Sequence, residues 1–183
     1  FGEHNARNIS VAAILAMEIG VDINIIKNTI KNFGGAKRRL DLIFENEKIK
    51  IYDDYAHHHT QVKVTMTALR DNLDKNEKII AILEPHLISR IKNNTKEYKD
   101  ALLTADFSII TKIFKSRESF KADIDVVKLI DNSKISYIEN FDEIVFSIRN
   151  IIDREKNYNF SILVMGAGNS YKLAKNLKEV FDI

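Results

Sequence analysis

The chain has 183 residues, which is enough for one sizeable domain with a smaller attached segment. Its 28 basic and 26 acidic residues leave a net charge of +2, so there is no general electrostatic case for nucleic-acid or membrane binding. The absence of cysteine excludes disulfides, cysteine-ligated zinc and a thiol nucleophile, and it fits a cytoplasmic location. No apolar run reaches the length of a membrane span, and no signal peptide is visible.

The first 35 residues predict two helices. Residues 5–20 form a helical pattern that is apolar almost all round, so this helix must be covered on more than one side. Asp22 caps a second helix, which Gly34-Gly35 ends. The chain opens on Phe1 within the first helical pattern, so we interpret it as a piece of a longer protein. We expect the first helix to be covered by self-association or by packing onto the rest of the chain.

From residue 36 onwards, strands and helices alternate. The basic stretch Gly34 to Arg39 is the candidate boundary between residues 1–35 and a domain of residues 36–183. Strands are expected at residues 41–44, 48–52, 78–83, 107–111, 135–138 and 160–165. Helices are expected at residues 60–73, 91–104 and 123–131, from Asn140 onwards, and after Gly168. Repeated strand–helix units indicate an α/β fold with a mostly parallel sheet and helices on both faces.

The carboxyl ends of parallel strands gather on one edge of a sheet, where such folds bind their ligands. That edge would carry residues 54–59, 85–90, 117–118 and 166–169. Two adjacent carboxylates, Asp53 and Asp54, end the second strand and must point to opposite sides. A paired acid–base site is one interpretation. A single carboxylate that accepts hydrogen bonds from ribose hydroxyls is the more economical one.

Other motifs at this edge leave alternatives open. Three consecutive histidines, His57 to His59, cannot all reach one metal ion and lack matching ligand spacing, which favours an anion-binding histidine or an exposed loop. Gly166-Ala167-Gly168 is a weak dinucleotide motif, but it is a reasonable anion site at a helix start. Lys37 to Arg39 and Arg90 are either partners of phosphate or carboxylate groups or ordinary surface charges.

Taken together, these motifs resemble the Mur ligase family, the ATP-dependent amino-acid ligases of peptidoglycan synthesis. The resemblance covers the whole chain in the family's order, and the run from Asp53 to His58 is its most specific part. The matching residues are Gly2-Glu3-His4-Asn5 with Asn8, Phe33-Gly34-Gly35 with Arg38-Arg39, Asp53-Asp54-Tyr55-Ala56-His57-His58 with Thr60, Pro85-His86 with Ser89-Arg90, and Gly166-Ala167-Gly168.

The resemblance implies a Rossmann-like C-terminal domain preceded by two helices from a truncated central ATPase domain. It implies a cytoplasmic enzyme whose cofactors are ATP and Mg²⁺, with the magnesium ligands mostly in the missing central domain. The branch that the chain resembles most adds L-alanine to UDP-N-acetylmuramate through an acyl phosphate, and the alternative branch adds a murein tripeptide. The implied partners are these small molecules and the missing N-terminal and central domains, so this chain alone is expected to be inactive.

Positions that match the family's motifs give the implied site. The implied ATP-binding residues are His4, Asn5, Asn8, Arg39 and Asp54. The implied amino-acid-binding residues are Tyr55, His57, Arg90, Gly168 and Asn169. No catalytic residue and no metal ligand is assigned within this chain. The chain departs from the family pattern at three positions, with His59 in place of Pro, Gln61 in place of Glu, and Leu87 in place of one of two arginines.

Two further classes of function remain open. The chain is alternatively a stand-alone nucleotide- or anion-binding module, or a structural interaction domain whose polar edge is incidental. A phosphate-binding GxxGKT-type segment upstream of Phe1 would favour the ligase over the stand-alone module. The interaction domain differs from both because it predicts no protection by ligands.

Overall fold

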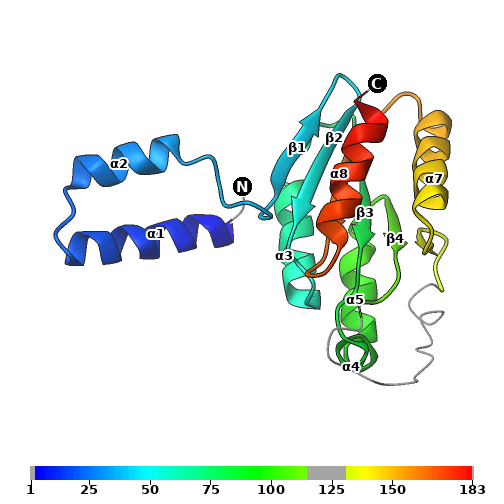
Figure 1. Cartoon of the computed structure of the whole chain (residues 1–183), viewed down its shortest axis with the longest axis horizontal. Helices are drawn as coiled ribbons and strands as arrows, with labels where there is room; N and C mark the ends of the chain where they lie inside the picture. Colours follow the sequence, from blue (N-terminus) through cyan, green and yellow to red (C-terminus); the bar gives the residue numbers. More distant parts are fainter. Residues whose placement is uncertain (1–2, 115–130, 183) are drawn as a thin grey trace.

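The computed structural model describes residues 3–114 and 131–182. Its first two helices, α1 (Glu3–Glu18) and α2 (Ile23–Asn32), form a hairpin that stands beside the rest of the chain (Figure 1). Asp22 caps α2, as expected, because its side chain accepts a hydrogen bond from the Asn24 N–H at 2.8 Å. Gly34-Gly35 and the following exposed residues then lead into the sheet.

A six-stranded sheet forms the centre of the remaining chain, in the order β1-β2-β6-β3-β4-β5. β1 is antiparallel to β2, and every other neighbouring pair is parallel, which confirms the predicted α/β fold. The strand bounds are β1 (Asp41–Glu45), β2 (Ile49–Asp54), β3 (Glu77–Leu83), β4 (Phe107–Ile110), β5 (Ile135–Tyr137) and β6 (Asn159–Met165).

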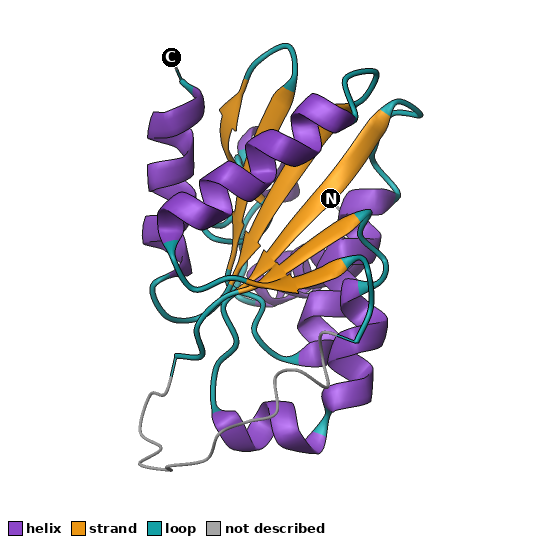
Figure 2. Cartoon of the chain, turned by 90° about the vertical axis from the view of Figure 1, so that its right-hand side faces the viewer, coloured by secondary structure: helices purple, strands orange, loops and turns teal. Residues whose placement is uncertain are grey.

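Helices cover both faces of the sheet (Figure 2). Apolar residues of α3 (His59–Arg70), α4 (Ile88–Asn93) and α5 (Thr95–Leu102) pack in one core cluster with one face of the strands. Those of α7 (Phe141–Arg154) and α8 (Ser170–Phe181) pack in a second cluster with the opposite face. Alternate residues of β2, β3 and β6 contribute to the two clusters, as the period of a β-strand requires.

One helix boundary differs from the sequence-based expectation. Residues 91–104 form two helices instead of one, and the first begins at Ile88, inside the expected loop. The break is at Asn94, whose backbone (φ −135°, ψ 34°) is not helical. Its side chain donates to the Arg90 carbonyl at 2.8 Å, the kind of local bond by which Asn competes with helix continuation. The expected loop at 117–118 and nearly all of the expected helix at 123–131 lie outside the described residues.

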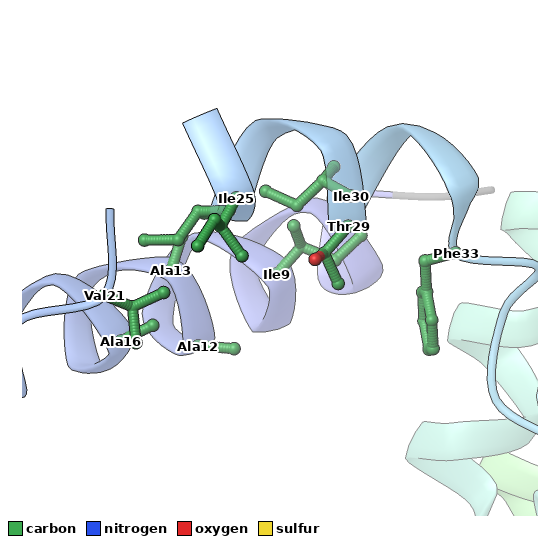
Figure 3. Close-up of a pocket in the computed structure, with 10 residues that line it drawn as sticks. Ile9, Ala12, Ala13, Ala16, Val21, Ile25, Thr29, Ile30 and Phe33 are labelled. Carbon is green, nitrogen blue, oxygen red and sulfur yellow. The ribbon is translucent and has the colours of Figure 1, made fainter. Parts of the chain in front are cut away.

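The outer side of α1 is apolar and exposed. Ile14 is 58% exposed and Leu15 is 61% exposed. The inner sides of α1 and α2 enclose an apolar cavity of about 350 Å³, lined by residues that include Ile9, Ala13 and Ile25 (Figure 3). In the described residues this outer side is not covered by the rest of the chain, so of the two expected ways of covering it self-association stays a prediction.

Candidate functional site

The strand register brings four loops together at one edge of the sheet. Asp54, Met165, Leu83 and Ile110 lie in a row, since each is aligned with the next across neighbouring parallel strands. The chain segments that follow these four residues therefore leave the sheet side by side. We call residues 55–58, 84–87, 111–114 and 166–169 the carboxyl edge.

The two aspartates at the end of β2 face opposite sides, as expected. Asp54 is buried on the α3 side, where its carboxylate accepts hydrogen bonds from Leu40 N at 2.8 Å and Ala56 N at 2.7 Å. The Thr65 hydroxyl of α3 donates to the same carboxylate at 3.5 Å. These donors belong to the protein itself, so Asp54 fixes the turn before β1 and the loop after β2. Its assignment to ATP binding stays a prediction.

Asp53 is buried on the α8 side and pairs with Arg38. Arg38 Nε donates to Asp53 Oδ2 at 3.1 Å. Burial raises the pKa of the Asp53 carboxyl above its usual value, although the Arg38 charge opposes that rise. The second oxygen, Oδ1, is buried and has no hydrogen-bond donor among the described residues. A buried acceptor without a donor is rare in native proteins, so Asp53 is the stronger candidate to receive a ligand hydroxyl.

Arg38 was missed as an individual site residue because the sequence shows it only within a basic run. Its Nη2 donates to the Gly166 carbonyl at 2.7 Å and to the Ser170 hydroxyl at 3.0 Å. Its guanidinium also lies over the rings of Tyr55, at 5.0 Å, and Tyr171, at 5.4 Å. Arg38 thus connects the end of β2 to the turn between β6 and α8, and it holds Tyr55 at the carboxyl edge.

The three histidines have three different roles. The His57 ring packs edge-on against the rings of Tyr55, at 5.3 Å, and His86, at 5.2 Å. His58 is the N-cap of α3, because its Nδ1 accepts from the Thr60 N–H at 3.3 Å. Burial and neighbouring positive charges lower the His58 pKa, which keeps this acceptor unprotonated. The His59 ring packs on Tyr98. The His59 ring also lies against the His58 ring, at 4.2 Å, whereas the His57 ring contacts side chains of two carboxyl-edge loops, Tyr55 and His86.

Tyr98 of α5 connects His57 with Arg90. Its hydroxyl donates to the His57 carbonyl at 2.6 Å, and burial raises the Tyr98 pKa to about 12. The Arg90 charge acts on Tyr98 and also on His58. Arg90 Nη1 is buried and has no hydrogen-bond partner among the described residues. Tyr98 is therefore hydrogen-bonded to the His57 backbone and is within range of the Arg90 charge.

The glycine turn after β6 binds a carboxylate of the protein itself, that of Glu84, which directly follows β3. Glu84 accepts from the backbone N–H groups of Gly168, Asn169 and Ser170, the last at 3.1 Å. A side chain at Gly168 would lie 2.6 Å from both Glu84 Oε2 and the Phe114 ring, so only glycine fits there. The expected anion site at this helix start is thus occupied by the protein's own carboxylate, and binding of the amino acid by Gly168 and Asn169 stays a prediction.

Three of the predicted ATP-binding residues line one groove. Asn5 and Asn8 of α1 and Arg39 of the following link border a cavity of about 650 Å³ between the hairpin and β1. Leu40, which also lines it, donates its N–H to Asp54, so Asp54 lies directly behind this groove. The side chain of His4 is not among those described. The structure therefore brings three of the predicted ATP-binding residues close to the end of β2, and their role in ATP binding stays a prediction.

The described residues contain no group of three or more His, Cys, Asp or Glu side chains placed to hold a metal ion. This part of the chain therefore does not by itself fit a Mg²⁺ site. Within the same residues, no helix is both long enough and apolar enough to cross a membrane.

The fold is a Rossmann-like α/β domain, and the edge where its parallel strands end is the candidate ligand site. Residues 38–168 match the family model described as "Mur ligase, glutamate ligase domain". The chain belongs to the Mur ligase family.

Named relatives and solved structures agree with this assignment. The chain is 34% identical over 185 residues to the UDP-N-acetylmuramate–L-alanine ligase of Pelagibacter ubique, covering 98% of this chain and 39% of that protein. It is 33% identical to the ligase of the same name from Sulfurihydrogenibium sp., covering 96% of this chain and 38% of that protein. The chain thus spans about two fifths of the length of these relatives.

Two solved structures show the same fold. The UDP-N-acetylmuramate–alanine ligase of Thermotoga maritima superimposes with a TM-score of 0.76 at 21% identity, over 100% of this chain and 38% of that one. The murein peptide ligase of Psychrobacter arcticus superimposes with a TM-score of 0.65 at 23% identity, over 96% of this chain and 36% of that one. Both matches include the helical hairpin as well as the sheet domain, because they cover nearly the whole chain.

Proposed function

We propose that this chain is the amino-acid-adding part of an ATP-dependent ligase that joins L-alanine to UDP-N-acetylmuramate in peptidoglycan synthesis. The family match and the names of the relatives support this substrate pair. Residues 36–183 would be the C-terminal domain, and residues 1–35 would be the last helices of a central nucleotide-binding domain. The proposal includes a cytoplasmic location, which the absence of cysteine favours.

One observation supports the amino-acid site most strongly, and it is the state of Arg90. A buried guanidinium N–H without an acceptor costs free energy, commonly about 1–3 kcal/mol. Arg90 Nη1 is in that state among the described residues, beside His58 and Tyr98. A substrate carboxylate would supply the missing acceptor, in the bonding geometry that arginine favours. Since Leu87 carries no charge, Arg90 would carry this interaction without help from that position.

The ATP side of the site would lie at the groove between the hairpin and β1. Asn5, Asn8 and Arg39 line that groove. We propose that Asp53, with its unpartnered buried oxygen, accepts from a ribose hydroxyl, and that Asp54 shapes the loop behind it. Because Asp53 Oδ1 is covered by protein atoms, nucleotide binding would require the Arg38–Asp53 pair to shift.

The proposed reaction has two steps. The muramate carboxylate attacks the terminal phosphorus of ATP, which gives an acyl phosphate and ADP. The alanine nitrogen then attacks the acyl carbon, the carbon–oxygen bond to phosphate breaks, and the phosphate leaves with the electron pair. The 183 residues contain no GxxxxGK[ST] sequence, so phosphate binding must come from another part of the complete protein.

A product assay tests this function. The complete protein, incubated with ATP, UDP-N-acetylmuramate and L-alanine, should release ADP and give a product heavier than UDP-N-acetylmuramate by one alanyl residue, as read by mass spectrometry. The 183-residue chain alone should give neither, because it has no phosphate-binding loop.

Parallel reactions separate the alternatives. Replacing alanine by the tripeptide L-alanyl-γ-D-glutamyl-diaminopimelate should give no product; ligation of the tripeptide instead of alanine would identify a murein tripeptide ligase. Nucleotide binding by the complete protein without ligation of either substrate would support a binding module and contradict the proposal.

A further inference from the structure

His57 has its imidazole tautomer fixed by the backbone. Its Nδ1 lies 2.9 Å from the carbonyl oxygen of Tyr55. A carbonyl oxygen only accepts hydrogen bonds, so Nδ1 carries the proton and donates it. In the neutral ring, Nε2 then holds a lone pair and is an acceptor. A neutral His57 therefore has no N–H to offer a substrate carboxylate, but it has a site for a proton.

The surroundings hold this ring in place. Tyr98 donates to the His57 carbonyl at 2.6 Å, and the His57 N–H lies 3.3 Å from Gln61 Oε1, which accepts it. The ring itself packs against Tyr55 and His86. Within the described residues, the titratable groups that contact His57 are therefore Tyr55, Tyr98 and His86. His58 also interacts with it electrostatically, and Arg90 acts in turn on His58 and Tyr98.

We propose that His57 Nε2 is the base that removes a proton from the ammonium group of the incoming amino acid. This inference rests on the proposed function. An ammonium nitrogen has no lone pair, so it cannot attack the acyl phosphate until one proton leaves. His57 takes that proton and becomes an imidazolium. The neutral amine forms the carbon–nitrogen bond, phosphate departs with its electron pair, and the second proton lost from nitrogen goes to the phosphate.

The positions of Arg90 and His57 are compatible with carboxylate binding by the first and proton transfer by the second. The Tyr98 hydroxyl donates to the backbone carbonyl of His57, and the Arg90 charge acts on the same hydroxyl. In an α-amino acid, a single carbon separates the ammonium group from the carboxylate. A substrate with its carboxylate on Arg90 would hold its ammonium group one carbon away, and the proposal places that group at the His57 Nε2. The structure thus assigns carboxylate binding to Arg90 and proton transfer to His57.

The test uses the complete protein and the variants His57→Gln and His59→Gln, with alanine ligation followed from pH 7 to pH 10. His57→Gln should lower kcat by about a hundredfold or more at pH 7, the usual contribution of a general base. The deficit should shrink as the pH approaches the pKa of free alanine's amine, because the substrate then arrives deprotonated. His59→Gln should keep the wild-type profile, since the His59 ring packs on Tyr98 and His58 and is not the proposed proton acceptor.

Two added compounds distinguish a general-base role of His57 from a structural or substrate-binding role. Hydroxylamine, which is already neutral at pH 7, should form the hydroxamate at the wild-type rate in His57→Gln. Added imidazole should restore alanine ligation by His57→Ala. A deficit that is independent of pH, that appears only in the KM for alanine, or that extends to hydroxamate formation would overturn the inference. If the wild type forms neither hydroxamate nor alanyl product, the proposed function itself fails, and this inference fails with it.

Discussion

At the scale of single residues, two adjacent arginines show what a one-dimensional pattern leaves out. The sequence presents Arg38 and Arg39 as equal members of a basic run. In the structure Arg39 is exposed and lines the groove beside α1, whereas Arg38 bonds to Asp53, Gly166 and Ser170. The difference comes from the backbone, because Arg38 has a φ of 59°, which non-glycine residues rarely adopt. Propensity and periodicity do not predict such a conformation, so the sequence could not distinguish the two.

Replacing Arg38 should therefore destabilise the fold. Arg38→Ala leaves the Asp53 carboxylate buried without its cation, a loss of about 3–5 kcal/mol for fully buried pairs. Because the Arg38 side chain is 25% exposed, we expect about 2–3 kcal/mol, measured by urea denaturation of the 183-residue chain at pH 7. Arg39→Ala is the matched control and should change the free energy of unfolding by less than about 0.5 kcal/mol. Equal losses in the two variants would show that the Arg38 contacts do not stabilise the fold.

At the scale of elements, the sequence predicted where α3 and α8 begin, but it did not predict which groups accept hydrogen bonds from their first backbone N–H groups. Periodicity after Thr60 and the glycines after Met165 located both helices from the sequence. The capping groups were not predicted. The α3 cap is a histidine, which is not a common N-cap residue, and the α8 cap is Glu84, which is distant in sequence. A cap that comes from another strand depends on tertiary structure, so local pattern rules could not find it.

Glu84 should make stability depend on pH. Burial raises the pKa of its carboxyl, so between the unfolded and folded pKa values the folded state binds more protons than the unfolded state. Folding stability from this group is then present at low pH and is lost as the pH rises through the folded pKa. Glu84→Gln cannot lose a proton, so its free energy of unfolding relative to wild type should increase from pH 4 to pH 7.

Denaturant titrations of both proteins at several pH values measure this difference. The exposed Glu97→Gln, on α5, is the control and should show no such trend. The idea is wrong if Glu84→Gln loses stability relative to wild type as the pH rises, because Glu84 would then be stabilised as an anion at the α8 start.

At the scale of the whole molecule, the fold class follows from the sequence and the strand order does not. Alternating strand and helix patterns predicted a mostly parallel sheet, and the described structure confirms it. The last strand, β6, lies between β2 and β3, and its residues from Phe160 to Met165 are all buried. A continuous apolar run indicates a central strand, but it does not say between which neighbours. The site could be predicted only as a shared edge of the sheet, because the contacts among its loops depend on that order.

We propose that Arg90 of α4, the helix that follows carboxyl-edge residues 84–87, receives the carboxylate of the incoming amino acid. Steady-state kinetics of Arg90→Ala in the complete protein test this most directly, with the exposed Lys92→Ala of the same helix as control. A lost charged hydrogen bond of about 1.5–3 kcal/mol predicts a KM for alanine that rises roughly tenfold to a hundredfold. The KM for ATP should stay at its wild-type value, and Lys92→Ala should leave both constants unchanged. A KM for alanine within about twofold of wild type in Arg90→Ala, well under 1 kcal/mol, would contradict the account.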